Sequence, residues 1–141
     1  MSAVRIEETE TLDPDVRAFA DAAWERFDLE TWGHTFERKR LVLTAQLDGR
    51  LIGVAIGWTG MGVAFLSELI VDASVRGRGT GSALLAAFEE RAKSRGCPRM
   101  ALRTEEGGPA RRFYESHGWR VEARFEDWFD GSTFVQMRKD A

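Results

Sequence analysis

Cysteine and histidine are scarce in this chain, and a long apolar run is missing. The single cysteine, Cys97, rules out an internal disulfide and is typical of a reducing cytoplasm. The two histidines, His34 and His117, are too few and too scattered to predict a metal site, and we expect His117 to serve in packing. No apolar run approaches the roughly 20 residues of a membrane span. Residues 1–10 are acidic and lack the basic start and apolar middle of a signal peptide. We therefore expect a cytoplasmic protein with no membrane partner and no metal.

An excess of basic charge is also missing. The chain carries 20 Lys and Arg against 23 Asp and Glu, a net charge of −3, which argues against a nucleic-acid partner. Its 141 residues suit one domain, and an apolar fraction of 43% with five tryptophans is enough for one core. We predict a single domain over residues 1–141.

Hydrophobic periodicity predicts an alternation of strands and helices along the chain. We expect strands over Val4–Thr9, Leu41–Leu47, Leu51–Trp58, Ala64–Val71, Arg99–Thr104, Trp119–Trp128 and Thr133–Arg138. We expect helices from Pro14 to near Phe27, from about Thr80 to Arg95 and from Pro109 to Gly118, with a short further helix within Leu29–Arg38 that Gly33 weakens. Asp48-Gly49 and Asp130-Gly131 are typical of type I′ hairpin turns.

One stretch, Glu68–Phe88, organises the rest. The β-branched-rich run Leu69-Ile70-Val71 suits a buried strand, and Arg76-Gly77-Arg78-Gly79-Thr80-Gly81 follows it before an amphipathic helix. Glycines let the backbone approach a ligand closely, and a helix start presents free N–H groups and a positive dipole end. The two arginines add positive charge. The stretch therefore predicts a phosphate or pyrophosphate site.

Two common phosphate loops do not fit this stretch. It lacks the Gly-Lys-Ser/Thr ending of a Walker loop. Ser82 stands where a dinucleotide fingerprint needs its third glycine, and Cys97–Thr104 offers no acid for a ribose.

The pattern Arg-x-x-Gly-x-Gly after Val71 instead resembles motif A of the GNAT superfamily, the acetyl-CoA-dependent N-acetyltransferases. A second stretch, Ala110–Trp119, closely resembles motif B of that family, Ala-x-x-Phe-Tyr-x-x-x-Gly-Phe, with Trp119 at the last aromatic position. The predicted order of elements is also that of the family. The resemblance implies an α/β (α+β) fold, with a mixed, mostly antiparallel sheet of about seven strands, a splayed central parallel pair and about four helices.

By this resemblance, acetyl-CoA is the co-substrate. The edges Leu69–Asp72 and Leu102–Thr104 are expected to pair with the pantetheine arm, with the Val71 N–H donating to the acetyl carbonyl. The stretch Thr104-Glu105-Glu106 departs from the family, which often has Asn near this point. The implied coenzyme-binding residues are Leu69, Ile70, Val71, Arg76, Gly77, Arg78, Gly79, Thr80, Gly81, Ser82, Thr104, Arg111 and Tyr114.

Acetyl transfer to an amine also needs a proton acceptor and a proton donor. Tyr114 matches the motif B tyrosine, which implies that it protonates the leaving thiolate; packing in the core is the alternative. Glu68 is the best candidate for the base, and a solvated or arginine-paired charge at a strand end is the alternative. Glu105 or Glu106 could instead attract a cationic amine.

We therefore predict a GNAT N-acetyltransferase that transfers acetyl directly to a primary amine of a small molecule. The alternatives are a peptide or protein amine, a non-catalytic acyl-CoA-binding module, and a toxin that acts on charged tRNA, which the acidic balance disfavours. The identity of the amine, longer acyl groups and the oligomeric state stay open, although homodimers are common in related proteins.

Overall fold

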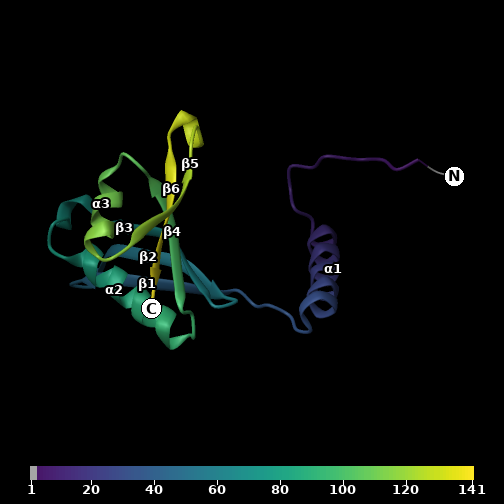
Figure 1. The fold of residues 1–141 in the computed structure, drawn as a ribbon, viewed down its shortest axis with the longest axis horizontal. Helices are drawn as coiled ribbons and strands as arrows, with labels where there is room; N and C mark the ends of the chain where they lie inside the picture. The colour runs from purple at the N-terminus through teal and green to yellow at the C-terminus, as the bar shows by residue number, and fades with distance from the viewer. Residues whose placement is uncertain (1–2) are drawn as a thin grey trace. The chain divides into compact units, whose positions relative to one another are not determined.

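The computed structural model describes residues 3–141, which divide into two compact units (Figure 1). The first unit runs to Phe36 and contains helix α1 (Pro14–Trp32). The second unit, Glu37–Ala141, contains the sheet and the remaining helices. A single domain over residues 1–141 stays a prediction.

The first unit differs from the prediction in two places. Helix α1 begins at Pro14 as predicted but continues past Phe27, because residues 28–32 contain no helix breaker. The helix ends at Trp32, because Gly33 takes a φ of 81° and its N–H donates to the Leu29 carbonyl oxygen at 3.0 Å. The prediction of a separate short helix within Leu29–Arg38 was therefore wrong. The prediction of a strand over Val4–Thr9 was also wrong. That segment is irregular, since no strand of the described chain pairs with it.

The second unit is built on one sheet with the order β1-β2-β3-β4-β6-β5 (Figure 1). All neighbouring strands are antiparallel except β3 and β4, which are parallel, as the family resemblance implied. Residues 3–141 hold six strands and three α-helices rather than about seven and four. The strands are β1 (Lys39–Leu47), β2 (Arg50–Gly60), β3 (Val63–Val71), β4 (Arg99–Glu105), β5 (Arg120–Phe125) and β6 (Phe134–Asp140).

Both predicted Asp-Gly turns are present. Asp130 and Gly131 have φ values of 51° and 74°, and the Ser132 N–H donates to the Phe129 carbonyl oxygen at 3.0 Å, which is the geometry of a type I′ turn. Strand β5 nevertheless ends at Phe125 rather than Trp128, because Asp127 has a φ of 49°.

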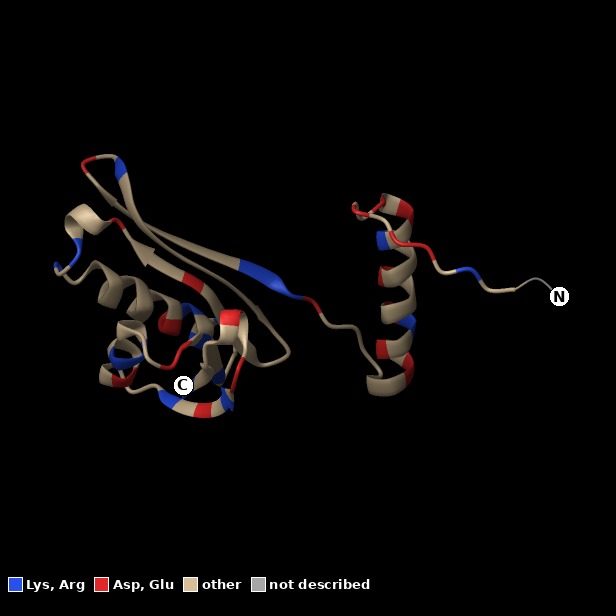
Figure 2. Ribbon diagram, turned by 90° about the horizontal axis from the view of Figure 1, so that it is seen from above, with Lys and Arg blue, Asp and Glu red and all other residues tan. Residues whose placement is uncertain are grey.

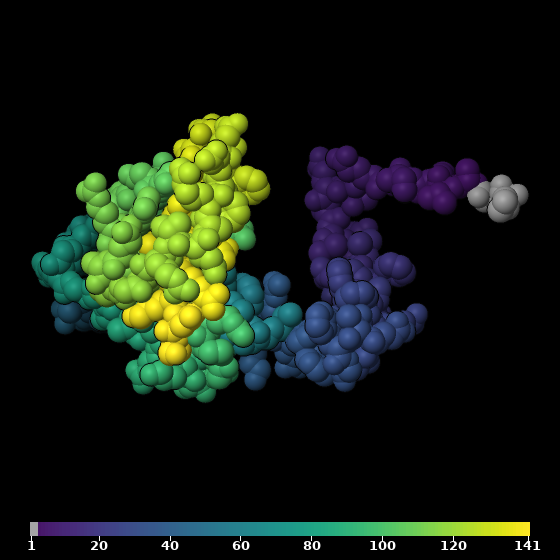
Figure 3. Space-filling model, in the orientation of Figure 1, coloured from purple at the N-terminus to yellow at the C-terminus, as the bar shows by residue number. Residues whose placement is uncertain are grey.

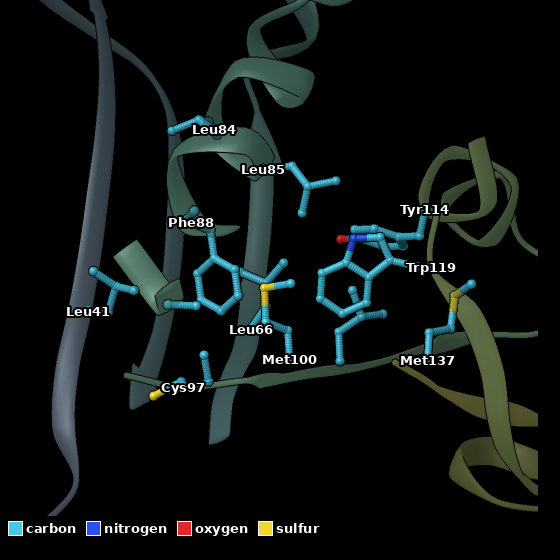
Figure 4. Packing of buried hydrophobic residues seen from close by; sticks show 14 of the residues in the cluster. Leu41, Leu66, Leu84, Leu85, Phe88, Cys97, Met100, Tyr114, Trp119 and Met137 are labelled. Carbon is cyan, nitrogen blue, oxygen red and sulfur yellow. The ribbon is translucent and has the colours of Figure 1, made fainter. Parts of the chain in front are cut away.

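The core lies between the sheet and helix α2 (Thr80–Ser94). Figure 4 shows Leu85 and Phe88 of α2 packed toward Leu66 of β3 and Met100 of β4. Helix α3 (Pro109–Ser116) adds Tyr114 to this cluster. In the space-filling view these elements form one closely packed body (Figure 3). The predicted amphipathic helix after the glycine stretch is therefore what holds that stretch against the sheet.

Charges of both signs are interspersed along the chain (Figure 2). Among the described residues, no helix has the length and apolar character that crossing a membrane requires.

Candidate active site

The parallel pair β3–β4 separates partway along its length. Its ladder runs from Val63 opposite Arg99 to Leu66 opposite Leu102 and goes no further. Strand β3 also carries one extra residue, Ser67, relative to β2, because Ile56 pairs with Glu68 while Gly57 pairs with Leu66. Beyond this bulge, β3 and β4 no longer pair with each other, and we call the separation between these two strand ends the cleft.

Backbone amides of β3 face this cleft. The Asp72 N–H donates to the Ile52 carbonyl oxygen of β2 at 2.7 Å. Hydrogen bonds alternate along an antiparallel strand, so the amides of Leu69 and Val71 point away from β2, toward the side that β4 has left. These amides can therefore donate hydrogen bonds to a ligand that lies in the cleft.

The bend after β3 is held by local hydrogen bonds. The Asp72 carboxylate accepts from the Ser74 N–H at 3.0 Å and from the Ser74 hydroxyl at 3.1 Å, and these bonds lower the pKa of Asp72. The Arg76 Nε donates to the Val71 carbonyl oxygen at 3.2 Å. Gly77 and Gly79 then adopt φ values of 81° and 82°, which residues with a Cβ rarely adopt.

The amides of residues 77–82 have no acceptor within the described part of the chain. The first bond of helix α2 runs from the Ala83 N–H to the Gly79 carbonyl oxygen at 3.0 Å. The preceding N–H groups are therefore free at the positive end of the helix dipole, where an anion is stabilised.

A cavity of about 620 Å³ lies against the end of β3, the bend and helix α3. It contains ten of the predicted site residues and four that were not predicted: Val75, Pro109, Ala110 and Phe113. Phe113 is partly buried against the core and also lines the cavity; its position beside Tyr114 in motif B is the sequence signal for it. The predicted residues that line the cavity are Leu69, Ile70, Val71, Arg76, Gly77, Gly79, Thr80, Gly81, Ser82 and Tyr114.

Tyr114 reaches the cavity from the core side. Its side chain is only 8% exposed, and burial raises its pKa to about 12. Burial is the only cause of this shift, and no hydrogen bond of the hydroxyl is found within residues 3–141. The group is therefore a protonated phenol at neutral pH, with its donor unused.

Ser82 is linked to helix α3 through His117. The His117 Nε2 lies 3.0 Å from the Ser82 Oγ, and its Nδ1 lies 2.8 Å from the Phe113 carbonyl oxygen. Packing was the role predicted for His117, and these contacts add a polar one: the ring holds a hydroxyl in the first turn of α2.

Four predicted residues do not line the cavity. Glu68 is exposed and, as the partner of Ile56, lies on the sheet face opposite α2. Arg78 is exposed in the bend, and Thr104 pairs with Val135 of β6. Arg111 is held in ion pairs with Glu106 and Glu115.

Glu106 is an unsuitable attractor for a cationic amine. Its two carboxylate oxygens each accept from Arg124 at 2.9 Å, and this interaction lowers the pKa of Glu106. Within residues 3–141, no group of three or more His, Cys, Asp or Glu side chains could hold a metal.

The chain is similar in sequence and in fold to known proteins. Residues 4–119 match the model of the acetyltransferase (GNAT) family. An acetyltransferase of Agrobacterium fabrum is 30% identical over 80% of this chain and 82% of its own. A crystal structure assigned as an acetyltransferase of Agrobacterium tumefaciens matches with a TM-score of 0.82 at 23% identity, over 98% of this chain and 100% of its own.

A further structure, assigned as a streptothricin acetyltransferase of Bacillus anthracis and solved in complex with acetyl coenzyme A, has a TM-score of 0.68 at 21% identity. It covers 73% of this chain and 63% of its own.

Proposed function

The chain belongs to the GNAT family of acetyltransferases, and we propose that it transfers acetyl from acetyl-CoA directly to a primary amine of a small molecule. One observation carries this proposal. The β3–β4 ladder ends at Leu66 and Leu102, and the cleft beyond it meets a bend whose amides are free. A cavity of about 620 Å³ is within the range of small-molecule sites.

The diphosphate of the coenzyme is assigned to the amides of residues 77–82, with Arg76 beside them. The Leu69 and Val71 amides are assigned to the thioester arm, and the Val71 N–H to the carbonyl oxygen on which charge develops. This places the thioester between the two diverging strands, with α2 on one side of the sheet.

The acceptor is assigned to the opposite face of the sheet, where Glu68 lies. The amine nitrogen attacks the thioester carbon, the C–S bond breaks, and an amide forms. Glu68, directly or through water, accepts the proton that the amine loses. The Tyr114 hydroxyl donates its proton to the departing thiolate. Neither side chain forms a covalent intermediate, so both substrates must be bound together. A cytoplasmic location stays a prediction.

A thiol-release assay with acetyl-CoA and a panel of amines, amino acids and peptides tests the proposal. We expect thiol release that depends on a small amine and follows a ternary-complex rate law. Release with peptides alone would favour a peptide or protein acceptor. Coenzyme binding in calorimetry without release for any amine would favour a non-catalytic module and overturn the proposal.

A further inference from the structure

A row of stacked aromatic and arginine side chains crosses the sheet face opposite α2. The Arg38 guanidinium carbon lies 4.4 Å from the centre of the Trp58 ring, and Trp58 stacks on Phe65 at 5.8 Å with an angle of 16°. The Arg103 guanidinium carbon lies 5.9 Å from the Phe65 ring and 5.1 Å from the Phe125 ring. This row is built from four strands and the segment before β1, so no local sequence pattern predicts it.

Arg103 stands at the edge of the cleft. It is the first residue of β4 beyond Leu102, the last residue that pairs with β3. Met100 and Leu102 are buried in the core under α2, so side chains alternate and Arg103 projects from the opposite face. Glu68 projects from that same face of β3 on the other side of the separation. An acid and a guanidinium therefore flank the cleft on the face assigned to the acceptor.

The charge of Arg103 is not matched by an acid. Arg138 lies two residues from Gln136 on β6 and projects from the same face as Arg103, and it contacts Glu122 and Asp140. No carboxylate within the described residues lies within 4.0 Å of Arg103. The neighbouring arginine on this face is therefore neutralised by acids, whereas Arg103 is not.

One hydrogen bond fixes the orientation of the Arg103 guanidinium, while its two terminal nitrogens stay free. Its Nε donates to the Gln136 Oε1 at 3.2 Å, and the Gln136 amide nitrogen donates in turn to Glu122 at 2.9 Å. The two terminal nitrogens of Arg103 have no protein acceptor among residues 3–141. A planar guanidinium held at Nε and flanked by two rings suits a bidentate bond to a carboxylate.

We propose that Arg103 binds a carboxylate of the acceptor, so that the substrate class is an amino acid with an apolar or aromatic side chain. This inference rests on the proposed function. The amine faces Glu68, the carboxylate faces Arg103, and Phe65 and Phe125 contact the apolar part. Arg103 acts in specificity and takes no part in the chemical step.

Matched pairs of acceptors test the proposal: phenylalanine against phenethylamine, and methionine against 3-(methylthio)propylamine, each at saturating acetyl-CoA. We expect the native protein to use each amino acid with a KM about ten- to a hundredfold lower than that of its decarboxylated partner, the effect of one charge-assisted hydrogen-bonded pair. In Arg103→Met this preference should vanish, with kcat and the Kd of acetyl-CoA unchanged. Arg103→Lys keeps the positive charge but cannot make the bidentate bond, so it should retain only part of the preference.

Arg38→Met is the matched control. It removes an arginine stacked in the same way on Trp58, away from the β3–β4 separation, and should leave the preference intact. Equal use of both partners by the native protein, or an equal rise in KM for both in Arg103→Met, would overturn the carboxylate assignment while leaving acetyl transfer in place. A preference for O-phosphoethanolamine over both amino acids would overturn it in favour of a phosphate. Coenzyme binding without thiol release for any amine would instead refute the proposed function itself.

Discussion

Tyr114 offers an unusually direct test, because it is the only tyrosine in the chain. The change in ultraviolet absorbance when the phenol ionises to tyrosinate therefore reports this one group. Burial raises its pKa from 10.0 to about 12. We expect the folded protein to titrate near that value after a rapid pH jump, and the protein unfolded in denaturant to titrate near the ordinary value of about 10.

The same difference makes stability depend on pH. Between the two pKa values the folded state keeps a proton that the unfolded state has lost, so the free energy of unfolding falls as pH rises. A pKa difference between about 10 and about 12 corresponds to a loss of about 2.7 kcal/mol in the free energy of unfolding. Solvent that reaches the hydroxyl from the cavity reduces the expected loss to about 2 kcal/mol. Urea unfolding at pH 9 and at pH 12 measures this loss.

Tyr114→Phe is the matched variant, because it removes only the hydroxyl. Its unfolding free energy should fall less over the same pH range than that of the native protein. Its turnover should fall by about 10²- to 10⁴-fold, the usual contribution of a positioned acid, with the Kd of acetyl-CoA unchanged. A folded-state titration near 10 would refute the buried donor, and unchanged turnover would refute its role as the acid.

Three further substitutions test separate parts of the structure. Gly79→Ala places a Cβ at a φ of 82°, which should cost about 1–2 kcal/mol in unfolding and raise the Kd of acetyl-CoA in calorimetry. Glu68→Gln keeps the shape but accepts no proton, so kcat should fall about 10²-fold or more without a change in coenzyme Kd; an unaltered pH–rate profile would point to another base. Phe88→Ala opens a cavity under the sheet and should cost about 3–5 kcal/mol in urea unfolding; a loss below about 1 kcal/mol would contradict its central place in the core.

Local signals predicted most of the fold. Asp48-Gly49 and Asp130-Gly131 placed two hairpins, because only a few residue types tolerate the positive φ values of such turns. The prediction of a strand over Val4–Thr9 was wrong because alternating apolar and polar residues show only that a segment can form a strand. They do not show that a sheet edge is available to pair with it. The end of α1 depended on Gly33 rather than on the last periodic apolar residue.

The candidate site was predictable where one continuous stretch forms it. Residues 76–82 come together because they are neighbours in sequence, and most of them line the cavity. The stacking of Arg103 between Phe65 and Phe125 depends on which strands are adjacent and in which register, so no sequence spacing revealed it. The same holds for the contact between Ser82 and His117.

The proposed function requires that the free amides of the bend and of the β3 edge bind the coenzyme. Amide nuclear magnetic resonance of the ¹⁵N-labelled protein during an acetyl-CoA titration tests it most directly. We predict that the largest shifts fall on Gly77–Ser82, Leu69 and Val71, with small shifts for amides already bonded in the β1–β2 ladder. Saturation without shifts in those residues, or no shifts at millimolar coenzyme, would contradict it.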